Sequence, residues 1–269
     1  MSGPLVLIKG AGDLASGVAV RLANCGYSIV MLEVAQPTVI RRTVAFAETV
    51  YQEKCSVEGI TACLATEAAA VAAILTQGNI AVMVDPQWES IAALRPVAVV
   101  DAIIAKRNLG TTLTEAPVVI GLGPGFTAGT DVHAVIETMR GHDLGRVIYQ
   151  GSAIPDTGVP GEIAGYASER LLRATAKGVF RAKRQIADAV LAGDVVAEIG
   201  GVPLVAEISG ILRGILRDGL NVVPGFKVGD IDPRCERQHC FTVSDKARAI
   251  GGGVVEALLH LTHGVTECK

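Results

Sequence analysis

The strongest chemical signal in the sequence is a glycine turn that follows an apolar run near residue 10. Residues 5–8 are Leu-Val-Leu-Ile, and Gly10, Gly12 and Ala15 then occupy the small-residue positions of a G-x-G-x-x-A pattern. Gly10 permits the tight turn, Gly12 lets a phosphate approach the backbone, and Ala15 lets a following helix pack on the strand. The start of that helix would direct N–H groups at an anion. We therefore expect the turn residues to bind a cofactor diphosphate: Gly10, Gly12, Asp13, Leu14 and Ala15.

The segment after this turn predicts contacts for the rest of a dinucleotide. Residues 28–33 form an apolar run that ends in Glu33, about twenty residues after the turn, where dinucleotide-binding folds hold a ribose. Arg41 or Arg42 would meet a further phosphate. Asp101 ends another apolar run and would reach the same edge of the sheet. The alternative is a βαβ unit without a nucleotide, in which the glycines serve packing alone.

The densest polar stretch covers residues 121–147 and begins with a glycine-rich loop. If residues 132–138 form a strand, His133 and Glu137 share one face of it. With Arg140, they would supply a catalytic base or a phosphate clamp. The alternative is a hydrogen-bonded loop that joins two domains. The glycines of the loop would line the opposite wall of the cofactor site: Gly121, Gly123 and Gly125.

A second polar cluster contains Asp230 and Asp232. In an extended segment their side chains point the same way, so they would hold a cation through oxygen ligands or pair with Arg234. The alternative is an ordinary turn, since Asp-Pro often starts one.

The six cysteines are irregularly spaced, which favours reduced thiols over a disulfide framework. Cys235, His239 and Cys240 do not have the spacing of a zinc site. Cys25 and Cys55 are lone cysteines, and most lone cysteines are simply buried.

The elements that must position these residues fit an α/β fold class. Strand-like and helix-like segments alternate over residues 1–150, which predicts a Rossmann-like domain with a parallel sheet. Residues 151–170 are rich in Gly and Pro and are typical of a linker. Residues 171–242 show frequent turn signals and a hairpin at Gly200-Gly201, which predicts a small β-rich, barrel-sandwich-like domain. Residues 243–269 contain a helix that we expect to pack back on the first domain.

Shorter predictions complete this outline. We expect a helix over 39–51, a strand over 57–64, a helix over 67–75, and buried strands over 80–84 and 97–100. The glycines at 251–253 lie inside the last helix and predict a close backbone approach, either to a ligand or to a neighbouring strand.

Composition excludes several classes of protein. The formal net charge is −3 and aromatic residues make up 4% of the chain, which argues against a nucleic-acid binder. No apolar run reaches membrane-spanning length, and no basic segment precedes an apolar one as in a signal peptide. We therefore expect a cytoplasmic protein that contacts neither nucleic acid nor membrane.

Five stretches together resemble the YqeB-type accessory proteins of the selenium-dependent molybdenum hydroxylase system. They are KGAGDLASGVAVRL, RRTVAFAE, GLGPGFTAGTDVHAVIETMRGHDLGRV, KVGDIDPR and SDKARAIGGGVVEALL, and they lie between about residues 5 and 260. The amino-terminal segment also resembles, more loosely, the Rossmann portion of the XdhC/CoxI maturation factors.

The YqeB-type resemblance implies a maturation factor that prepares or inserts a molybdopterin-type cofactor, or its labile selenium. Under this hypothesis Cys25 and Cys55 are candidates for handling sulfur or selenium. Its partners would be a molybdenum hydroxylase client and other maturation factors, and a homo-oligomeric state stays open. The bound cofactor would be NAD(P) or a molybdopterin dinucleotide. One alternative is an NAD(P)-dependent oxidoreductase with His133 or Lys106 as proton donor, and another is a non-catalytic cofactor escort or scaffold.

Overall fold

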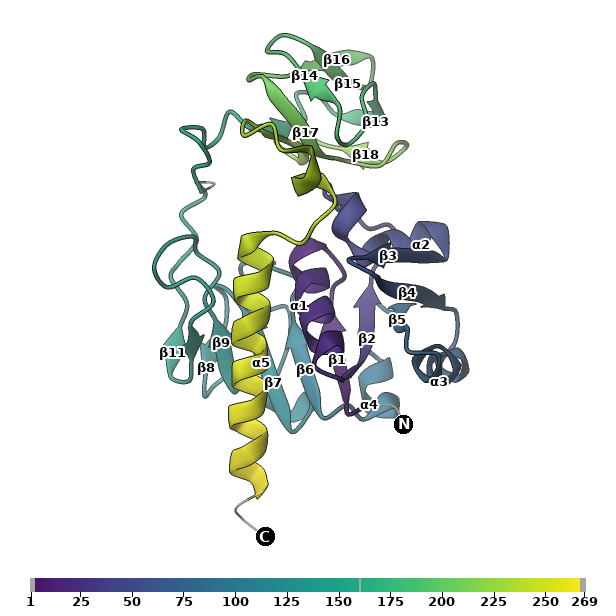
Figure 1. Ribbon diagram of the computed structural model, residues 1–269, viewed down its shortest axis with the longest axis vertical. Coiled ribbons are helices and arrows are strands. Elements are labelled where there is room, and N and C mark those ends of the chain that lie inside the picture. Colours follow the sequence, from purple (N-terminus) through teal and green to yellow (C-terminus); the bar gives the residue numbers. More distant parts are fainter. Residues whose placement is uncertain (1–2, 160, 267–269) are drawn as a thin grey trace. The chain divides into compact units, whose positions relative to one another are not determined.

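The computed structural model describes residues 3–159 and 161–266, and the chain divides into two compact units (Figure 1). The first unit contains Met1–Pro37, Ala45–Thr157 and Val243–Lys269. The second unit contains Thr38–Val44 and Gly158–Thr242. The last helix therefore belongs to the unit that begins the chain, and a short early segment belongs to the β-rich unit.

A mixed sheet forms the centre of the first unit. Its strand order is β10-β9-β7-β6-β1-β2-β5-β4-β3, and its neighbours are parallel except β10 beside β9 and β3 beside β4. When β3, β4 and β10 are set aside, the order in space is the 3-2-1-4-5-6 order of doubly wound sheets, which reverses between β1 and β6. The strands are β1 (Leu5–Lys9), β2 (Ser28–Glu33), β3 (Lys54–Val57), β4 (Ile60–Ala65), β5 (Ile80–Val84), β6 (Ala98–Asp101), β7 (Val118–Leu122), β9 (Ala134–Ile136) and β10 (Val147–Ile148). A small separate sheet pairs β8 (Thr127–Ala128) with β11 (Gly151–Ser152).

Helices cover both faces of this sheet, which explains why the central strands are apolar at nearly every position. On one face, α1 (Asp13–Asn24) packs against α5 (Asp245–Thr266), and the two run side by side in Figure 1. On the other face, side chains of α3 (Ala68–Thr76) and α4 (Ser90–Leu94) join the core formed by alternate strand residues. Gly17 of α1 is essential for the helix contact, because a Cβ there would lie 2.6 Å from the Cβ of Ala247.

The predicted strands over 28–33, 80–84 and 97–100 are confirmed to within one residue as β2, β5 and β6, and the predicted helix over 67–75 as α3. The expected helix over 39–51 is wrong. That segment forms η1 (Arg42–Val44), η2 (Phe46–Glu48) and α2 (Thr49–Gln52). The hydroxyl of Ser16 binds the N–H of Phe46, so a tertiary hydrogen bond replaces a helical one there.

The strand expected over 57–64 is also corrected, because a hairpin occupies this region. Strands β3 and β4 are joined at Glu58 and Gly59, which both have positive φ, as a tight hairpin turn requires. Another short helix, η3 (Leu113–Glu115), lies in the connection between β6 and β7.

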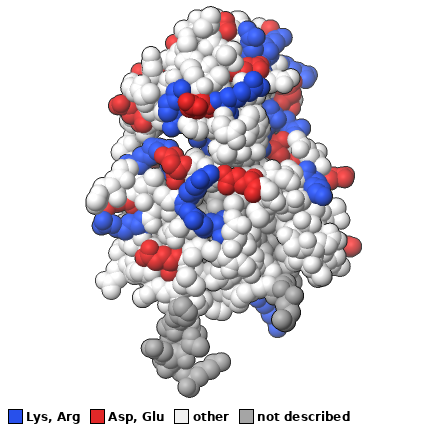
Figure 2. All heavy atoms as spheres, viewed as in Figure 1, with Lys and Arg blue, Asp and Glu red and all other residues white. Residues whose placement is uncertain are grey.

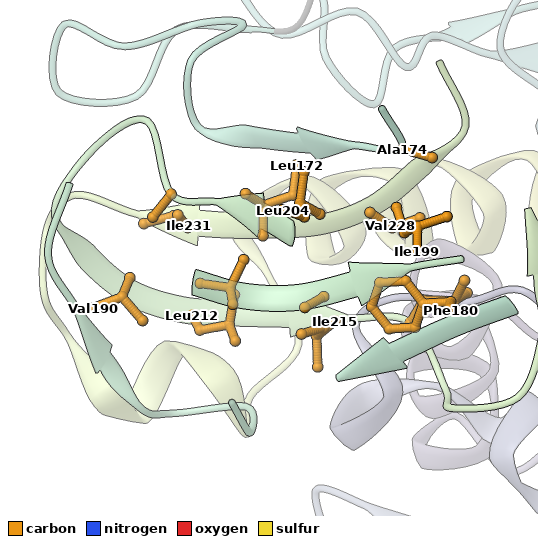
Figure 3. Close-up of a cluster of buried hydrophobic side chains, with 14 of the residues drawn as sticks. Leu172, Ala174, Phe180, Val190, Ile199, Leu204, Leu212, Ile215, Val228 and Ile231 are labelled. Carbon is orange, nitrogen blue, oxygen red and sulfur yellow. The ribbon is translucent and has the colours of Figure 1, made fainter. Parts of the chain in front are cut away.

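The second unit consists of two antiparallel sheets, in the orders β12-β19-β17-β14 and β16-β15-β13-β18. Apolar side chains from both sheets meet in one core, and Figure 3 shows Phe180, Leu212 and Ile231 among them. The predicted hairpin at Gly200-Gly201 joins β15 to β16, and both glycines have positive φ. The elements are β12 (Leu171–Arg173), β13 (Gly178–Ala182), β14 (Ala189–Val190), β15 (Val195–Ile199), β16 (Val202–Val205), β17 (Gly210–Ile215), β18 (Asn221–Val222), β19 (Lys227–Asp232) and η4 (Arg237–Cys240).

The glycines of α5 approach other backbone closely, as predicted. Gly253 leaves no space for a Cβ against the carbonyl oxygen of Gly145 and the side chain of Ile136 on β9. Gly251 packs on the backbone of α1, and Gly252 has open space around it. In the part of the chain that the structure describes, no helix combines the length and the hydropathy needed to cross a bilayer.

Candidate functional site

The glycine turn lies between β1 and α1, at the carboxyl edge of the parallel strands. Gly10 has a φ of +88°, so a side chain at this position would be strained. The N–H of Gly10 donates to the carbonyl oxygen of Leu32 at 2.7 Å. The carbonyl oxygen of Ala11 accepts from the N–H of Ala47 at 2.8 Å and from the hydroxyl of Ser16 at 3.1 Å. These bonds fix the turn backbone before any ligand binds.

The first turn of α1 has unsatisfied donors. Gly12 is the N-cap residue, and no side chain caps the helix. Among the described residues, none accepts a hydrogen bond from the N–H groups of Gly12, Leu14 or Ala15. Unsatisfied N–H groups at the start of a helix bind anions readily, because the helix dipole adds positive potential there. The predicted turn thus has donors available for an oxyanion.

Glu33 contacts the turn directly. It ends β2, and its Oε2 accepts a hydrogen bond from the N–H of Ala11 at 2.9 Å, while Oε1 accepts from the N–H of Val34 at 2.8 Å. Burial raises the pKa of Glu33, against the lowering effect of these two backbone bonds. The carboxylate thus already occupies the Ala11 donor, and an incoming diphosphate would have to use Gly12 and Leu14.

Asp101 belongs to a buried network instead of an open edge. Its Oδ2 accepts from the hydroxyl of Thr111 at 2.6 Å, and that hydroxyl accepts in turn from Nζ of Lys9 at 2.7 Å. Lys9 is fully buried, contacts Glu115 at 2.8 Å and lies 3.8 Å from the ring centroid of Trp88. Lys9 is not among the residues predicted for the site, although a lysine that ends an apolar strand run is an unusual placement.

Three glycines at the end of β7 and in the loop after it pack against the protein's own chain. A Cβ on Gly121 would meet the ring of Phe126 at 2.6 Å, and one on Gly123 would meet the Thr138 hydroxyl at 2.5 Å. Gly125 packs equally closely on the backbone of Arg107. Internal packing is therefore sufficient to explain these three glycines.

The candidate catalytic residues 133, 137 and 140 do not form one constellation. His133 Nδ1 accepts from the N–H of Val119, near the amino end of β7. Glu137 lies beyond the carboxyl end of β9 and accepts from the N–H groups of Met139 and Ile154, each at 2.7 Å. The strand between them covers only three residues, so the expected strand over 132–138 is shorter than predicted.

Arg140 forms a bidentate ion pair with Asp245 of α5, at 2.7 and 2.9 Å. It thus anchors α5 within the first unit, and its guanidinium fork is occupied by that carboxylate.

Arg41 and Arg42 belong to the second unit. Arg41 donates to the carbonyl oxygens of His239 and Thr242, and Arg42 donates to that of Ile215 at 2.8 Å. Both arginine side chains therefore form hydrogen bonds with backbone carbonyl oxygens of the second unit.

The two candidate metal residues pair with arginines. Asp230 contacts Arg170 at 2.5 Å, and Asp232 contacts Arg234 at 2.6 Å. Within the described residues, no group of three or more His, Cys, Asp and Glu side chains is arranged to hold a metal ion. Asp232 was predicted either to hold a cation or to pair with Arg234, and the geometry corresponds to the pair with Arg234.

The described cysteines differ in their exposure. Cys25 and Cys235 are exposed, and Cys240 is buried. Cys55 is partly buried beside the Thr49 hydroxyl at 3.0 Å, and burial raises the pKa of its thiol. A raised pKa lowers the thiolate fraction, so Cys55 is a poor nucleophile near neutral pH.

Charges are mixed on the face that Figure 2 shows. Acidic and basic side chains are interspersed there.

These features define an α/β protein with unsatisfied helix N–H groups at the carboxyl edge of a parallel sheet and with a separate β-rich unit. The chain is 56% identical over 266 residues to the Escherichia coli (strain K12) protein named "Uncharacterized protein YqeB". This match covers 98% of the chain but 49% of that relative, so the chain spans about half of the relative's length. The predicted resemblance to the YqeB-type proteins is confirmed, and the looser resemblance to XdhC/CoxI factors stays a prediction.

No family model matches the chain. Among solved structures, the product-bound ectoine utilization protein EutE (DoeB) from Ruegeria pomeroyi is 10% identical, with a TM-score of 0.26 over 86% of this chain and 85% of that one. A succinylglutamate desuccinylase/aspartoacylase from Rhodobacter sphaeroides is 13% identical, with a TM-score of 0.27 over 86% and 85% of the two chains. With scores this low, nothing about fold or activity follows from these two matches.

Proposed function

We propose that the first unit is a Rossmann-like domain that binds the diphosphate of a nucleotide or of a molybdopterin dinucleotide at the Gly10–Leu14 turn. The observation that carries this proposal is the set of unsatisfied N–H groups at the start of α1. The reversal of strand order between β1 and β6 supports it, because doubly wound sheets bind ligands at that point.

Two carboxyl groups limit the affinity of this site for phosphate. Each oxygen of Glu33 accepts one backbone N–H in the structure, which leaves lone pairs for a ribose hydroxyl. Asp13 adds a negative charge in the first turn of α1. Both charges weaken phosphate binding, so we expect moderate affinity rather than the tight binding of a phosphate cage.

In the cell this binding would serve the maturation of a molybdenum hydroxylase, selenium-dependent or not. This part of the proposal rests on the YqeB-type resemblance and on the 56% identity to that protein. The partners would be the hydroxylase client and other maturation factors, in the cytoplasm, with the second unit as a barrel-sandwich-like docking module. An NAD(P)-dependent oxidoreductase is less well supported, because His133 binds backbone near the amino end of β7, away from the carboxyl edge.

Thermal unfolding of the purified chain with added NAD, NADP or molybdopterin dinucleotide tests the proposal. We expect one of these ligands to raise the unfolding temperature of the wild type and Gly12→Val to abolish the rise. Gly12 has a φ of −65°, which valine adopts without backbone strain. The matched control is Gly252→Ala, which lies in open space on α5 and should keep the response.

The ligand that produces the shift distinguishes the hypotheses. Stabilisation by nicotinamide nucleotides alone would favour the oxidoreductase, and stabilisation by the molybdopterin dinucleotide would favour maturation or escort. If no ligand stabilises the wild type, or if Gly12→Val responds as the wild type does, the turn is not a cofactor site.

A further inference from the structure

A buried cluster of arginines lies on one face of the second unit's β17–β19 pair. Leu212 and Ile215 of β17 both point into the hydrophobic core, although they are three residues apart. A β-bulge between Leu212 and Gly214 makes this possible. It turns Arg213 to the opposite face, and bulges commonly aim a side chain in this way beside a functional site. Asp230 and Asp232 flank the core residue Ile231 and therefore share the face of Arg213.

Arg213 has no hydrogen-bond partner among the residues that the structure describes. Its side chain is 8% exposed, and its closest carboxylate oxygens are Oδ2 of Asp230 at 3.8 Å and Oδ2 of Asp232 at 3.9 Å. These distances are too long for hydrogen bonds. A guanidinium carries five N–H donors, and burying them without acceptors is costly. If Arg213 had only a structural role, we would expect its guanidinium to lie within hydrogen-bond distance of an aspartate, and it does not.

The nearby carboxylates are already satisfied by other arginines. Asp230 accepts from Arg170 at 2.5 Å, and Asp232 accepts from Nε and Nη2 of Arg234 at 2.9 and 2.6 Å. Arg213 is thus an additional cation in a cluster whose two acids are already paired.

Arg41 adds a further buried charge beside Arg213. It is 5% exposed, and its Cγ passes over Gly214, where a Cβ would lie 3.2 Å away. Burial lowers the pKa of Arg213, and the charge of Arg41 lowers it further, against the opposing effect of the two aspartates. Arg213 therefore lies beside the guanidinium of Arg41 and forms no hydrogen bond with either aspartate of the cluster.

We propose that this cluster is a binding site for a phosphate group, with Arg213 as its principal donor. The oxygens of a phosphate group would supply the acceptors that the Arg213 guanidinium lacks, and they match the planar fork of that guanidinium. The site is built entirely from the second unit and is separate from the glycine turn. The phosphate site goes beyond the proposed cofactor function. An experiment can refute the phosphate site without refuting the cofactor site, and the reverse is also true.

Inorganic phosphate is the probe, with the purified full chain. We expect phosphate to raise the thermal unfolding temperature of the wild type more than sodium chloride at equal ionic strength, and calorimetric titration to give saturable binding. Arg213→Met keeps an unbranched apolar side chain and removes the guanidinium with its charge, and it should weaken phosphate binding at least about tenfold. Arg181→Met, on the exposed side of β13, is the matched control and should bind as the wild type does.

The result in the wild type decides the proposal even if Arg213→Met fails to fold. Stabilisation by phosphate no greater than that by chloride would overturn it, and so would equal phosphate affinity in a folded Arg213→Met. Arg213→Lys gives a further check, because it keeps the charge but loses the fork, and it should bind phosphate more weakly than the wild type.

Discussion

Replacing Lys9 by methionine should destabilise the first unit by about 3–5 kcal/mol, the usual effect of removing one partner of a buried ion pair. Nζ of Lys9 has no solvent exposure and binds Thr111 and Glu115 at 2.7 and 2.8 Å. Methionine fills a similar volume, so the loss arises from the groups left behind and not from a cavity. The Glu115 side chain is only 16% exposed and recovers little hydration. Asp101 stays buried and loses the cation that reached it through the Thr111 hydroxyl.

Urea unfolding followed by tryptophan fluorescence measures this effect. Trp88 is the one tryptophan in the sequence, and its ring centroid is 3.8 Å from Nζ of Lys9, so the signal reports on the first unit. With a slope of about 2 kcal/mol per molar urea, the midpoint should fall by about 1.5–2.5 M. Lys54→Met, on exposed β3, is the control and should change the free energy of unfolding by less than about 0.5 kcal/mol.

A double-mutant cycle with Glu115→Gln separates the ion pair from general disruption. If the pair acts as described, the double variant should lose less free energy than the sum of the two single variants, by about 1 kcal/mol or more. A Lys9→Met variant that loses less than about 1 kcal/mol, or a cycle that is additive, would refute the view that this network stabilises the crossover between β6 and β7.

Three further predictions concern stability. Gly252→Ala should raise the free energy of unfolding by about 0.5–1 kcal/mol, because it improves helix propensity in open space, whereas Gly17→Ala should lower it by about 1–3 kcal/mol, because its Cβ would lie 2.6 Å from that of Ala247. Chemical denaturation of both variants checks the opposite signs of the same substitution. Burial alone would raise the pKa of Asp85, but hydrogen bonds from the hydroxyl and N–H of Ser90 outweigh it and lower the pKa. The ionised carboxylate therefore stabilises the fold above its ordinary pKa of about 3.8, and this is lost as pH falls through the lower folded value. Asp85→Asn should accordingly cost about 1 kcal/mol at pH 7 and nothing near pH 2, and a loss independent of pH would contradict this explanation.

The parallel strands could be predicted from local sequence because burial on both faces demands apolar residues at successive positions. Residues 28–33 and 80–84 show this pattern and form β2 and β5 with the predicted bounds. The segment 39–51 also has helical spacing, but its backbone is fixed by partners far away in the sequence. Ser16 and Ala11 bind the N–H groups of Phe46 and Ala47, and no local pattern encodes those bonds.

The two candidate sites also differ in how far local sequence could predict them. The glycine turn is a contiguous motif, so its strand, turn and helix could all be predicted from about twenty residues. The arginine cluster combines segments that are far apart in the chain, because Arg41 precedes Arg213 by 172 positions. Its central residue also depends on a one-residue bulge in β17, and without that bulge strict alternation would place Leu212 and Ile215 on opposite faces. Strict alternation along β17 could not show that Arg213 faces the aspartates. From the sequence alone, only Asp230 and Asp232 could be identified, and a cation was the ligand predicted for them. The structure places the guanidinium of Arg213 beside those same carboxylates without a hydrogen bond to either, and this is why we propose an anion and not a cation as the ligand of this face.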